Sequence, residues 1–463
     1  MKRRSFIKKT IAGATGTIII PTLVPASVFG KSAPSKKIHI AQIGCGRIAR
    51  GHDMLETFKC EDAMLVACCD VDSKRVEETK TLLEQWYSER TGNRRYKKIK
   101  VYMDYQEMIQ SRDIDAVIIS TPDHWHARIA MDAALAGKDI YLQKPASLTI
   151  HEGRQMSDII SKTGQILQMG CQQRSVNPWP QFKKACELVR NGRIGEIKEI
   201  YIGLPGDPPG NEELEMPVPP NLNYDVWLGS TPLVYYTEKR VHPQEGYDRP
   251  GWLRCEQFGA GMITGWGTHH IDTAHWAMGT ELTGPVEVEG FAKFPQSGLW
   301  DVHGDFNVMA RYVNGVSMYI SGEYPNGIKF IGAEGWIFVA RSDSAVTSSD
   351  PISQAETQKA LVASDPEILK SEIGRDEIHL HHSEEQHRDW LDSIKNRQQP
   401  VANAETGHRS CTACLVSHIA MKLRRKLYWD PEKEQFKNDD EANAMLSRPQ
   451  RKPYGTDQIN FKF

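Results

Sequence analysis

Residues 38–49, Ile38-His-Ile-Ala-Gln-Ile-Gly-Cys-Gly-Arg-Ile-Ala49, decide the fold of the first part of the chain. An apolar run typical of a strand stops at Gly44, Gly46 follows two residues later, and Ala49 comes three residues after that. In this G-x-G-x-x-A pattern the first glycine permits a tight turn, the second lets backbone approach a pyrophosphate, and the small third residue lets a helix pack on the strand. The free N–H groups that begin such a helix favour phosphate. The pattern predicts a dinucleotide-binding turn with contacts from Gly44, Gly46, Arg47, Ile48 and Ala49.

The sequence that follows supports this prediction. Residues 63–69 predict a second strand, and Asp70 comes directly after it. A carboxylate about 20 residues beyond the glycine turn can accept from a ribose 2′-hydroxyl, which favours NAD. Lys74 and Arg75 are close enough in sequence to meet a 2′-phosphate, so NADP stays possible. The alternative is an ordinary strand–turn–helix unit without a ligand.

Length and charge limit the class of protein. A chain of 463 residues favours two domains. Its 57 basic and 59 acidic residues nearly balance, so charge gives no reason to expect nucleic acid or an anionic membrane as a partner. The nine cysteines are scattered, and we expect buried thiols rather than redox or zinc chemistry, even at the C-x-x-C pair Cys411 and Cys414.

Residues 1–30 have the pattern of a targeting segment. A basic stretch precedes an apolar one that contains glycines and prolines. Residues 3–8, RRSFIK, resemble a twin-arginine export signal. Glycine and proline disfavour a spanning helix, so we expect export to the periplasm and no stable membrane span, with an uncleaved anchor as the alternative. Because that route carries folded proteins, the dinucleotide must be acquired in the cytosol, and we expect it to be tightly bound and recycled.

Residues 36–170 alternate strand and helix patterns. Runs at 98–103, 114–119, 139–142 and 164–169 predict four further strands. This alternation predicts an α/β domain with a doubly wound parallel sheet of Rossmann type. Ligands of such sheets bind beyond the carboxyl ends of the strands. Site candidates are therefore Thr121, Pro122, His124 and His126 after the fourth strand, Gln143 and Lys144 after the fifth, and Gln172 and Arg174 after the sixth.

Residues 171–430 predict a second, α+β domain with a largely antiparallel open sheet, and 431–463 a polar tail. The segment 204–250 is long for a loop, which indicates a functional role. Its Arg240 and His242 could bind sugar hydroxyls. The segment 259–276 predicts a helix on which Asp272 shares a face with His269, where a carboxylate could fix the imidazole tautomer.

Histidine is frequent in two segments. His270 and His275 accompany His269, and four more histidines lie between residues 379 and 387. Metal binding at the first group would need a further convergent ligand that the sequence does not identify. For the second group, solvated or capping roles are favoured over metal, so we predict no metal site.

The order of the G-x-G-x-x-A turn, Thr121-Pro122 with His126, and Lys144-Pro145 resembles the glucose–fructose oxidoreductase/inositol dehydrogenase (Gfo/Idh/MocA) family. The resemblance implies that Lys144 reaches the reacting carbon and that His126 and the Thr121–Pro122 turn border the nicotinamide. It also implies a second sheet that often serves as a subunit interface, so we expect a homo-oligomer.

Two positions depart from the family pattern. Members usually have glutamate where this chain has Gln143, and its loss should favour a neutral lysine. A helix of the family carries Asp-x-x-x-His-x-x-Asp, which places its histidine at His269, its second aspartate at Asp272, and Gly265 where the first aspartate belongs. Lys144 and His269 must then share the proton transfer, or Asp272, His270 or a loop residue assists.

Together these features predict a nicotinamide-dependent oxidoreductase that acts on a secondary hydroxyl of a sugar or glycoside. One candidate product is a 3-keto-glycoside, and the substrate candidates are Gln172, Arg174, Arg240, His242 and His270. One alternative is a glycoside hydrolase that oxidises, eliminates and reduces again, which would release free sugar without net reduction of the cofactor. The other is a non-catalytic sugar-binding module on a dehydrogenase fold.

Overall fold

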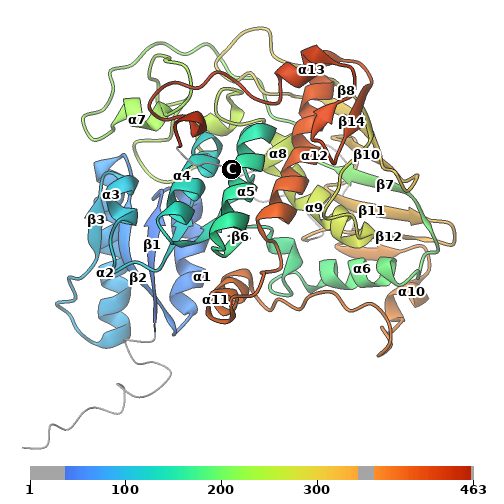
Figure 1. Ribbon diagram of the computed structural model, residues 1–463, viewed down its shortest axis with the longest axis horizontal. Coiled ribbons are helices and arrows are strands. Elements are labelled where there is room, and N and C mark those ends of the chain that lie inside the picture. The colour runs from blue at the N-terminus through green and yellow to red at the C-terminus, as the bar shows by residue number, and fades with distance from the viewer. Residues whose placement is uncertain (1–36, 343–358, 460–463) are drawn as a thin grey trace, which may run out of the picture. The chain divides into compact units, whose positions relative to one another are not determined.

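The computed structural model describes residues 37–342 and 359–459, so the predicted targeting segment lies outside the described residues. Six strands form the first sheet, in the order β3-β2-β1-β4-β5-β6, and every pair is parallel (Figure 1). This is the strand order of a Rossmann domain, which confirms the predicted fold class. The strands are β1 Ile38–Ile43, β2 Ala63–Cys69, β3 Lys100–Tyr102, β4 Ala116–Ile119, β5 Asp139–Leu142 and β6 Leu167–Met169.

Local sequence signals explain the helices of this domain. Asp72 caps α2 by accepting from the backbone N–H groups of Lys74 and Arg75. Thr149 and Glu152 form a capping box at the start of α5. A π-helical segment, η3, follows the glycine turn and leads into α1. The elements are η3 Ala49–Asp53, α1 Met54–Lys59, α2 Ser73–Thr91, α3 Tyr105–Ile109, α4 Asp123–Leu135 and α5 Ile150–Thr163.

The second sheet has nine strands in the order β13-β12-β11-β7-β10-β9-β8-β14-β15. It is antiparallel except between β7 and β10, which confirms the predicted, largely antiparallel sheet. The run 306–322 forms two strands because Asn314-Gly315 makes the turn between them, with Gly315 at φ 86°. The strands are β7 Ile197–Gly203, β8 Glu287–Ala292, β9 Phe306–Arg311, β10 Ser317–Ser321, β11 Gly327–Gly332, β12 Trp336–Val339, β13 Leu361–Ala363, β14 Leu427–Asp430 and β15 Gln435–Phe436.

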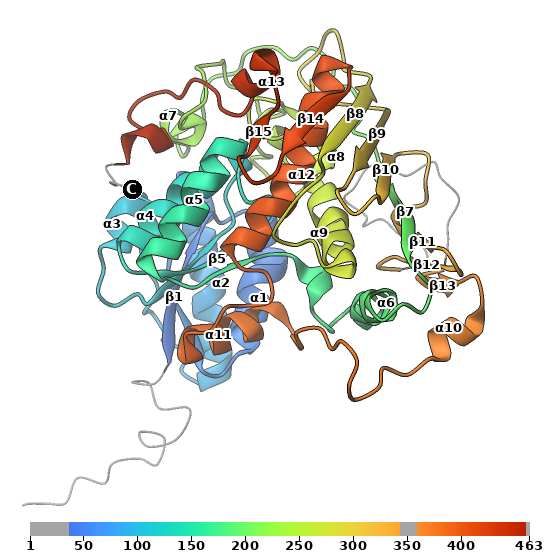
Figure 2. The same ribbon diagram turned by 45° about the vertical axis from the view of Figure 1, so that its right-hand side comes forward.

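Two late helices pack back on the first domain. The long helix α12 contacts α5 as well as β8 and is buried along almost its whole length, so Cys411 and Cys414 are buried free thiols (Figure 1). The helix α11 contacts α1, β5 and β6 (Figure 2). The helices of this part are α6 Pro180–Arg190, α7 Tyr224–Leu228, α8 Met262–Gly265, α9 Gly267–Met278, α10 Pro366–Lys370, α11 Gln386–Asn396, α12 Ala404–Leu423 and α13 Asp440–Ala444, with short 3-10 turns η4 Gln172–Arg174, η5 Gly251–Arg254 and η6 Thr456–Gln458.

The C-terminal tail contributes a strand to the second sheet and contacts both domains. Its strand β15 extends the second sheet. Arg128 of α4 donates to the carbonyl oxygen of Gly455 at 2.5 Å, and Tyr454 donates to Asp225 at 2.6 Å. The tail is thereby tied to both domains beside the cavity described below. Within the described residues, no helix combines the length and apolar character needed to span a membrane. The domain boundaries at 170 and 430 stay predictions.

Candidate active site

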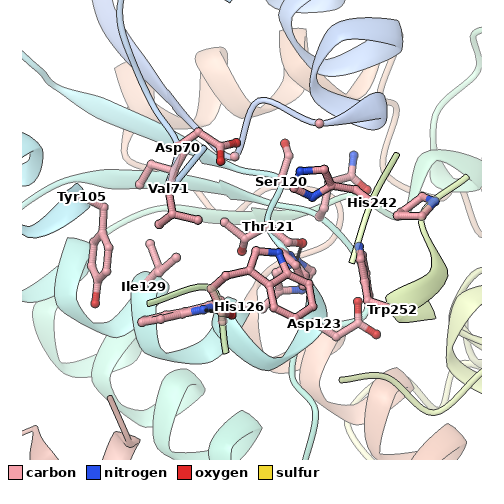
Figure 3. Close-up of a pocket in the computed structure, with 18 of the residues that line it drawn as sticks. Asp70, Val71, Tyr105, Ser120, Thr121, Asp123, His126, Ile129, His242 and Trp252 are labelled. Atoms are coloured by element: carbon pink, nitrogen blue, oxygen red, sulfur yellow. Dashed lines mark hydrogen bonds between the residues drawn. The ribbon is translucent and has the colours of Figure 1, made fainter. Parts of the chain in front are cut away.

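A cavity of about 860 Å³ opens where the strands of the parallel sheet end (Figure 3). Residues that follow β1, β2, β3, β4 and β5 all line it, as the strand-end rule predicts. The second domain adds Trp227, His242 and Trp252, and the tail adds Tyr454. The cavity therefore lies between the Rossmann sheet and segments that come much later in the chain.

The glycine turn has the geometry of a phosphate cradle. Gly44 has φ 82°, and a Cβ there would come within 2.7 Å of the carbonyl oxygen of Ser120, so only glycine fits. A Cβ on Gly46 would meet nothing within 4 Å, so its backbone faces open space. Arg47 and Ile48 also line the cavity, whereas Ala49 is fully buried beneath it. These residues fit the pyrophosphate of a dinucleotide.

Asp70 stands at the same end of the cavity. Its Oδ2 accepts from the backbone N–H of Cys45 at 2.6 Å, and its Oδ1 accepts from that of Asp72 at 2.9 Å. Burial raises the pKa of Asp70 despite these bonds. Each carboxylate oxygen keeps a second acceptor site, so the group can still bind ribose hydroxyls.

The loop that contains His242 folds onto the start of α2. His242 Nε2 lies 3.0 Å from Asp72 Oδ2, and Arg75 donates to the carbonyl oxygen of Pro243 at 2.8 Å. Lys74 donates to the carbonyl oxygen of Gln244 at 2.8 Å. His242 therefore lines the cavity while its Nε2 is paired with Asp72, and its predicted contact with substrate stays a prediction. We call residues 242–247 the clasp.

Lys144 lies at the other end of the cavity. Its Nζ donates to the carbonyl oxygen of Gly265 at 2.9 Å. Asp123, the first residue of α4, lines the same cavity and is only 4% exposed. Burial raises the pKa of Asp123 to about 7, although the charge of Lys144 acts in the opposite direction. Sequence reasoning missed Asp123, even though it stands inside the Thr121-Pro-Asp-x-x-His126 pattern, where a carboxylate could have been noticed.

The two histidines of α4 have different surroundings. The ring of His126 lies between two carbonyl oxygens, with Nδ1 2.7 Å from that of Pro145 and Nε2 2.9 Å from that of Thr121. Burial lowers the pKa of His126 to about 4, so the neutral ring donates to one of them and holds the turns after β4 and β5 together. His124 Nε2 lies 2.9 Å from the carbonyl oxygen of Trp227, and His124 does not line the cavity, unlike the prediction.

The predicted pair of His269 and Asp272 does not form. Asp272 accepts two hydrogen bonds from Arg174, at 2.7 and 2.9 Å, and a third from Ser410 at 2.8 Å. Nδ1 of His269 has no hydrogen-bond partner within the described part of the chain. Burial lowers the pKa of His269 well below its usual range. Helix spacing alone predicted that Asp272 would bind His269. Instead Asp272 binds the guanidinium of Arg174, which comes from a distant turn and makes a bidentate hydrogen bond.

Most of the predicted substrate contacts have other partners. Arg174 is buried in its pair with Asp272, and Arg240 donates to the carbonyl oxygen of Tyr235. His270 Nε2 lies 2.8 Å from Oδ1 of Asn326. Gln172 contacts the ring of His52. None of these four candidates, Gln172, Arg174, Arg240 and His270, lines the cavity, and neither does His269.

Gln143 has a partner that explains its departure from the family pattern. Its Nε2 donates to Oδ1 of Asp53 at 2.8 Å, and Asp53 is fully buried. Ser120 donates to the other oxygen of this carboxylate at 2.6 Å. A glutamate at position 143 would place two carboxylates together in a buried site, whereas glutamine supplies the donor that Asp53 requires.

Comparison with known proteins agrees with this geometry. A family described as "Oxidoreductase family, NAD-binding Rossmann fold" matches residues 38–171. Its counterpart, "Oxidoreductase family, C-terminal alpha/beta domain", matches residues 209–349 and 367–456. Together the two halves of one family cover most of the chain, including the turn and the cavity.

Two curated relatives are similar over part of their length. An alpha-N-acetylgalactosaminidase of Shewanella oneidensis is 32% identical over 178 residues, which are 37% of this chain and 36% of the relative. A myo-inositol 2-dehydrogenase of Thermotoga maritima is 31% identical over 175 residues, which are 37% of this chain and 47% of the relative. The chain thus spans less than half the length of these curated relatives.

The fold has relatives among solved structures. The WlbA dehydrogenase of Bordetella pertussis, in complex with NADH and UDP-GlcNAcA, superposes with a TM-score of 0.56 at 17% identity. The match covers 85% of this chain and 99% of that one, and at this identity it shows a shared fold. The strand order, the cavity and the two family matches show that the chain belongs to the Gfo/Idh/MocA oxidoreductase family, with an NAD-binding Rossmann fold.

Proposed function

We propose that this protein oxidises a secondary hydroxyl of a sugar or glycoside with NAD that it holds tightly, one candidate product being a 3-keto-glycoside. One observation carries the proposal. A single cavity is lined by the glycine turn and Asp70 and also by Lys144 and Asp123, and Figure 3 shows Asp70 and Asp123 on opposite sides of it. A dinucleotide held beside Asp70 would extend towards Asp123, where proton-accepting groups meet the substrate.

The surroundings of Asp70 favour NAD over NADP. The two cations that could meet a 2′-phosphate, Lys74 and Arg75, are both engaged with the clasp. The carboxylate of Asp70 suits a ribose hydroxyl and would repel a phosphate. An NADP-specific site would leave at least one of these cations available for the 2′-phosphate, whereas Arg75, although it lines the cavity, donates to the carbonyl oxygen of Pro243.

The clasp supports tight retention of the cofactor. His242, Pro243 and Gln244 contact α2 next to Asp70, so the clasp must open before a dinucleotide can leave from this end. This agrees with the expected need to carry the cofactor through export. Export to the periplasm, and a homo-oligomer through the second sheet, remain parts of the proposal that rest on the sequence.

The residues at the far end can handle the proton of an alcohol. Bound NAD would take the hydride from the carbinol carbon, and the hydroxyl proton must leave at the same time. The Lys144 ammonium, oriented by the carbonyl of Gly265, can donate a hydrogen bond to the hydroxyl oxygen and stabilise developing negative charge. The raised pKa of Asp123 suits a proton acceptor near neutral pH.

The walls suit a sugar. Trp125, Trp227 and Trp252 line the cavity, and aromatic rings pack well against the C–H faces of a pyranose. These rings also keep water from the reacting carbon. The cavity therefore combines a surface for the apolar face of the sugar with polar side chains that could select its hydroxyls.

The test uses the full-length protein, purified without added nucleotide. Denaturation should release NAD, and the native protein mixed with disaccharides and aryl glycosides should develop the fluorescence of reduced nicotinamide with at least one of them. Lys144→Met should retain the nucleotide and lose the reduction. Absence of bound dinucleotide would contradict tight retention, and failure of every glycoside to reduce it would contradict the substrate class.

A second function, glycoside hydrolysis through transient oxidation, is favoured by the similarity to an alpha-N-acetylgalactosaminidase. Oxidation acidifies the neighbouring C–H bond, so the Lys144–Asp123 pair could also assist elimination. In the same experiment this function would release monosaccharide while the bound nucleotide stays oxidised overall. Reduced nucleotide without monosaccharide would exclude it.

A further inference from the structure

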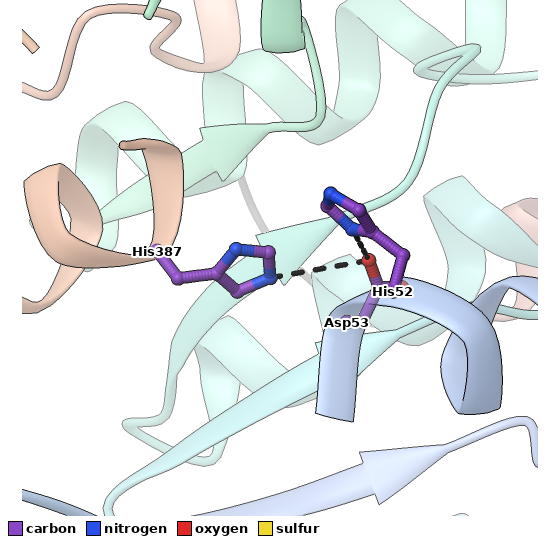
Figure 4. Close-up of side chains that lie close together, drawn as sticks. All are labelled: His52, Asp53 and His387. Carbon is purple, nitrogen blue, oxygen red and sulfur yellow. Dashed lines mark hydrogen bonds and ion pairs between the residues drawn. The ribbon is translucent and has the colours of Figure 1, made fainter. Parts of the chain in front are cut away.

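We propose that His52, Asp53 and His387 form a binding site for one divalent transition-metal ion of the Zn²⁺ class. One ligand atom from each residue lies within 4.8 Å of the other two (Figure 4). None of the three lines the nucleotide cavity, so this site is separate from the proposed function and does not depend on it.

The strongest observation in favour of a metal site is that Nε2 of His387 has no hydrogen-bond partner among the residues described. This side chain is completely buried, and its Nδ1 lies 2.9 Å from Oε1 of Glu385. A carboxylate there makes Nδ1 the donor and leaves a lone pair on Nε2. That Nε2 faces Oδ1 of Asp53 at 3.9 Å, too far for a hydrogen bond, and it has no other partner among the residues described. A lone pair that faces a carboxylate in a dry site is unfavourable unless a cation lies between them.

The other two ligands are also held from outside. Ser120 donates to Oδ2 of Asp53 at 2.6 Å, so Oδ1 is the oxygen that faces the histidines, and this oxygen also accepts from Nε2 of Gln143 at 2.8 Å. His52 has Nδ1 at 2.9 Å from that Oδ1, and its Nε2 lies 3.1 Å from the amide of Gln172. Asp53 and His387 would therefore bind through one atom while Ser120 and Glu385 orient the opposite one, which is the usual arrangement around protein-bound zinc. The atom of Gln172 next to His52 is an amide nitrogen, which donates, so an ion on Nδ1 of His52 requires the side-chain amide of Gln172 to present its oxygen to Nε2–H instead.

The donor set determines the class of ion. Two imidazoles and one carboxylate suit Zn²⁺, Co²⁺ or Ni²⁺ better than Mg²⁺ or Ca²⁺, which prefer oxygen ligands. Binding through Nδ1 of His52 displaces the proton that His52 shares with Asp53. A neutral ring carries this proton over to Nε2, whereas a protonated ring releases it to solvent, and in both cases the ligands are two neutral imidazoles and one carboxylate. No electron transfer is involved.

The position of the site indicates a structural role. His52 and Asp53 end the π-helical segment that follows the glycine turn, and such segments are frequent at functional sites. His387 comes from α11, far along the chain. A shared ion would tie α11 to the nucleotide-binding turn, and Gln143, which contacts Asp53 and directly precedes Lys144, would extend this order to the lysine.

The test uses full-length protein freed of metal with a chelator and then titrated with Co²⁺ or Zn²⁺. We expect about one Co²⁺ per chain with visible d–d absorption, displacement by Zn²⁺, and a higher Tm in the presence of either ion. His387→Asn should weaken Co²⁺ binding more than about tenfold. The matched control His275→Asn removes an equally buried histidine, bonded to Tyr312 at 2.7 Å, and should bind Co²⁺ as the unmodified protein does.

A second ligand variant guards against misfolding. The side chain of His52 is 29% exposed, so His52→Asn should fold even if His387→Asn does not, and it should also lose Co²⁺. The proposal is overturned if the unmodified protein binds no Co²⁺ or Zn²⁺, or if His52→Asn retains full affinity and the d–d spectrum.

Discussion

The ammonium of Lys144 donates to the carbonyl oxygen of Gly265 at 2.9 Å, at the position where the family resemblance led us to expect an aspartate. A carbonyl orients the lysine but cannot take up a proton. The titrating carboxylate next to this lysine is instead Asp123, which belongs to the same Rossmann domain as the lysine, whereas Gly265 belongs to the second domain. Under the proposed function, Gly265 would orient the lysine and Asp123 would take up the proton, so the two tasks would be divided between two residues.

Gly265→Asp should restore the family arrangement and shift the pH dependence. A Cβ at this position would meet only Sδ of Met262, at 3.7 Å, so the variant should fold. A carboxylate near Lys144 favours the charged lysine, which is the form that the proposed mechanism uses, so we expect the basic limb of kcat to move up by about one pH unit. Gly265→Ala is the control and should leave the limb in place. An equal shift in both variants would show that the carboxylate is not the cause.

Asp123→Asn should remove the proton acceptor. We expect kcat/KM at neutral pH to fall about 100-fold or more, and the dependence on a group of pKa about 7 to disappear. The measurement is a pH profile of sugar oxidation by protein loaded with NAD. Asp132→Asn, also on α4 but paired with Arg128, is the control and should keep the profile. A profile unchanged in Asp123→Asn would exclude a role for this carboxylate.

The same substitution should change stability in a predictable direction. Because burial raises the pKa of Asp123 to about 7, the folded protein binds this proton more tightly than the unfolded chain does. Ionising Asp123 therefore costs the folded protein stability, and this cost is absent below pH ~4 and grows as the pH rises towards 7. Denaturation at several pH values should show Asp123→Asn gaining stability relative to the unmodified protein as the pH increases. A difference independent of pH would contradict this.

Gln143→Glu should destabilise the protein through Asp53. Two buried carboxylates would replace a donor–acceptor pair now 2.8 Å apart, at a cost of about 1–3 kcal/mol. The new carboxyl would have a raised pKa, so the cost should be small below pH ~4 and increase with pH. The measurement is the free energy of unfolding in buffer with chelator.

Asp53→Asn combined with Gln143→Glu provides the matching control. The double variant exchanges the acid and the amide across the same contact, so it should recover most of the stability that Gln143→Glu loses. The changes in the free energy of unfolding caused by Asp53→Asn and Gln143→Glu, added together, predict the stability of the double variant if the two residues do not interact. A double variant no more stable than this sum would mean that the contact does not explain why glutamine stands at position 143.

Arg174→Met should affect stability rather than substrate binding. Arg174 and Asp272 are 2% and 1% exposed, and removing one member leaves a buried charge, which costs about 3–5 kcal/mol. Arg174→Met with Asp272→Leu should cost less, because no charge remains unpaired. We expect KM for the sugar to be unchanged in the folded fraction of either variant. A large rise in KM without loss of stability would restore the substrate role that the sequence predicted.

Arg75→Ala should loosen the clasp. Arg75 is buried and donates to the carbonyl oxygen of Pro243, so its loss should speed release of the dinucleotide about tenfold or more. Retention of nucleotide through gel filtration measures this. Lys80→Ala is the control, because Lys80 lies on the same helix but pairs only with the exposed Glu77. Equal retention in both variants would mean that the clasp does not hold the cofactor.

Local sequence determined the elements that form the cofactor end. The G-x-G-x-x-A turn, Asp70 after β2 and the capping box at Thr149 and Glu152 all depend on neighbours in the chain, and the structure has each of them. The strand-end rule then brought Lys144 and Thr121 to one edge of the sheet. These features follow from backbone geometry and the two-residue and 3.6-residue periods, which a single sequence reveals.

Only the tertiary structure determined which polar side chains pair with one another. Helix spacing assigned Asp272 to His269, but Arg174, nearly 100 residues earlier, forms a stronger bidentate bond with it. Asp123 became a candidate proton acceptor only because the structure buries it beside Lys144. His387 became a candidate metal ligand only because the structure brings it close to Asp53. Such partnerships depend on contacts between segments far apart in the chain, and no local pattern encodes which of several polar groups will meet once the two sheets pack together.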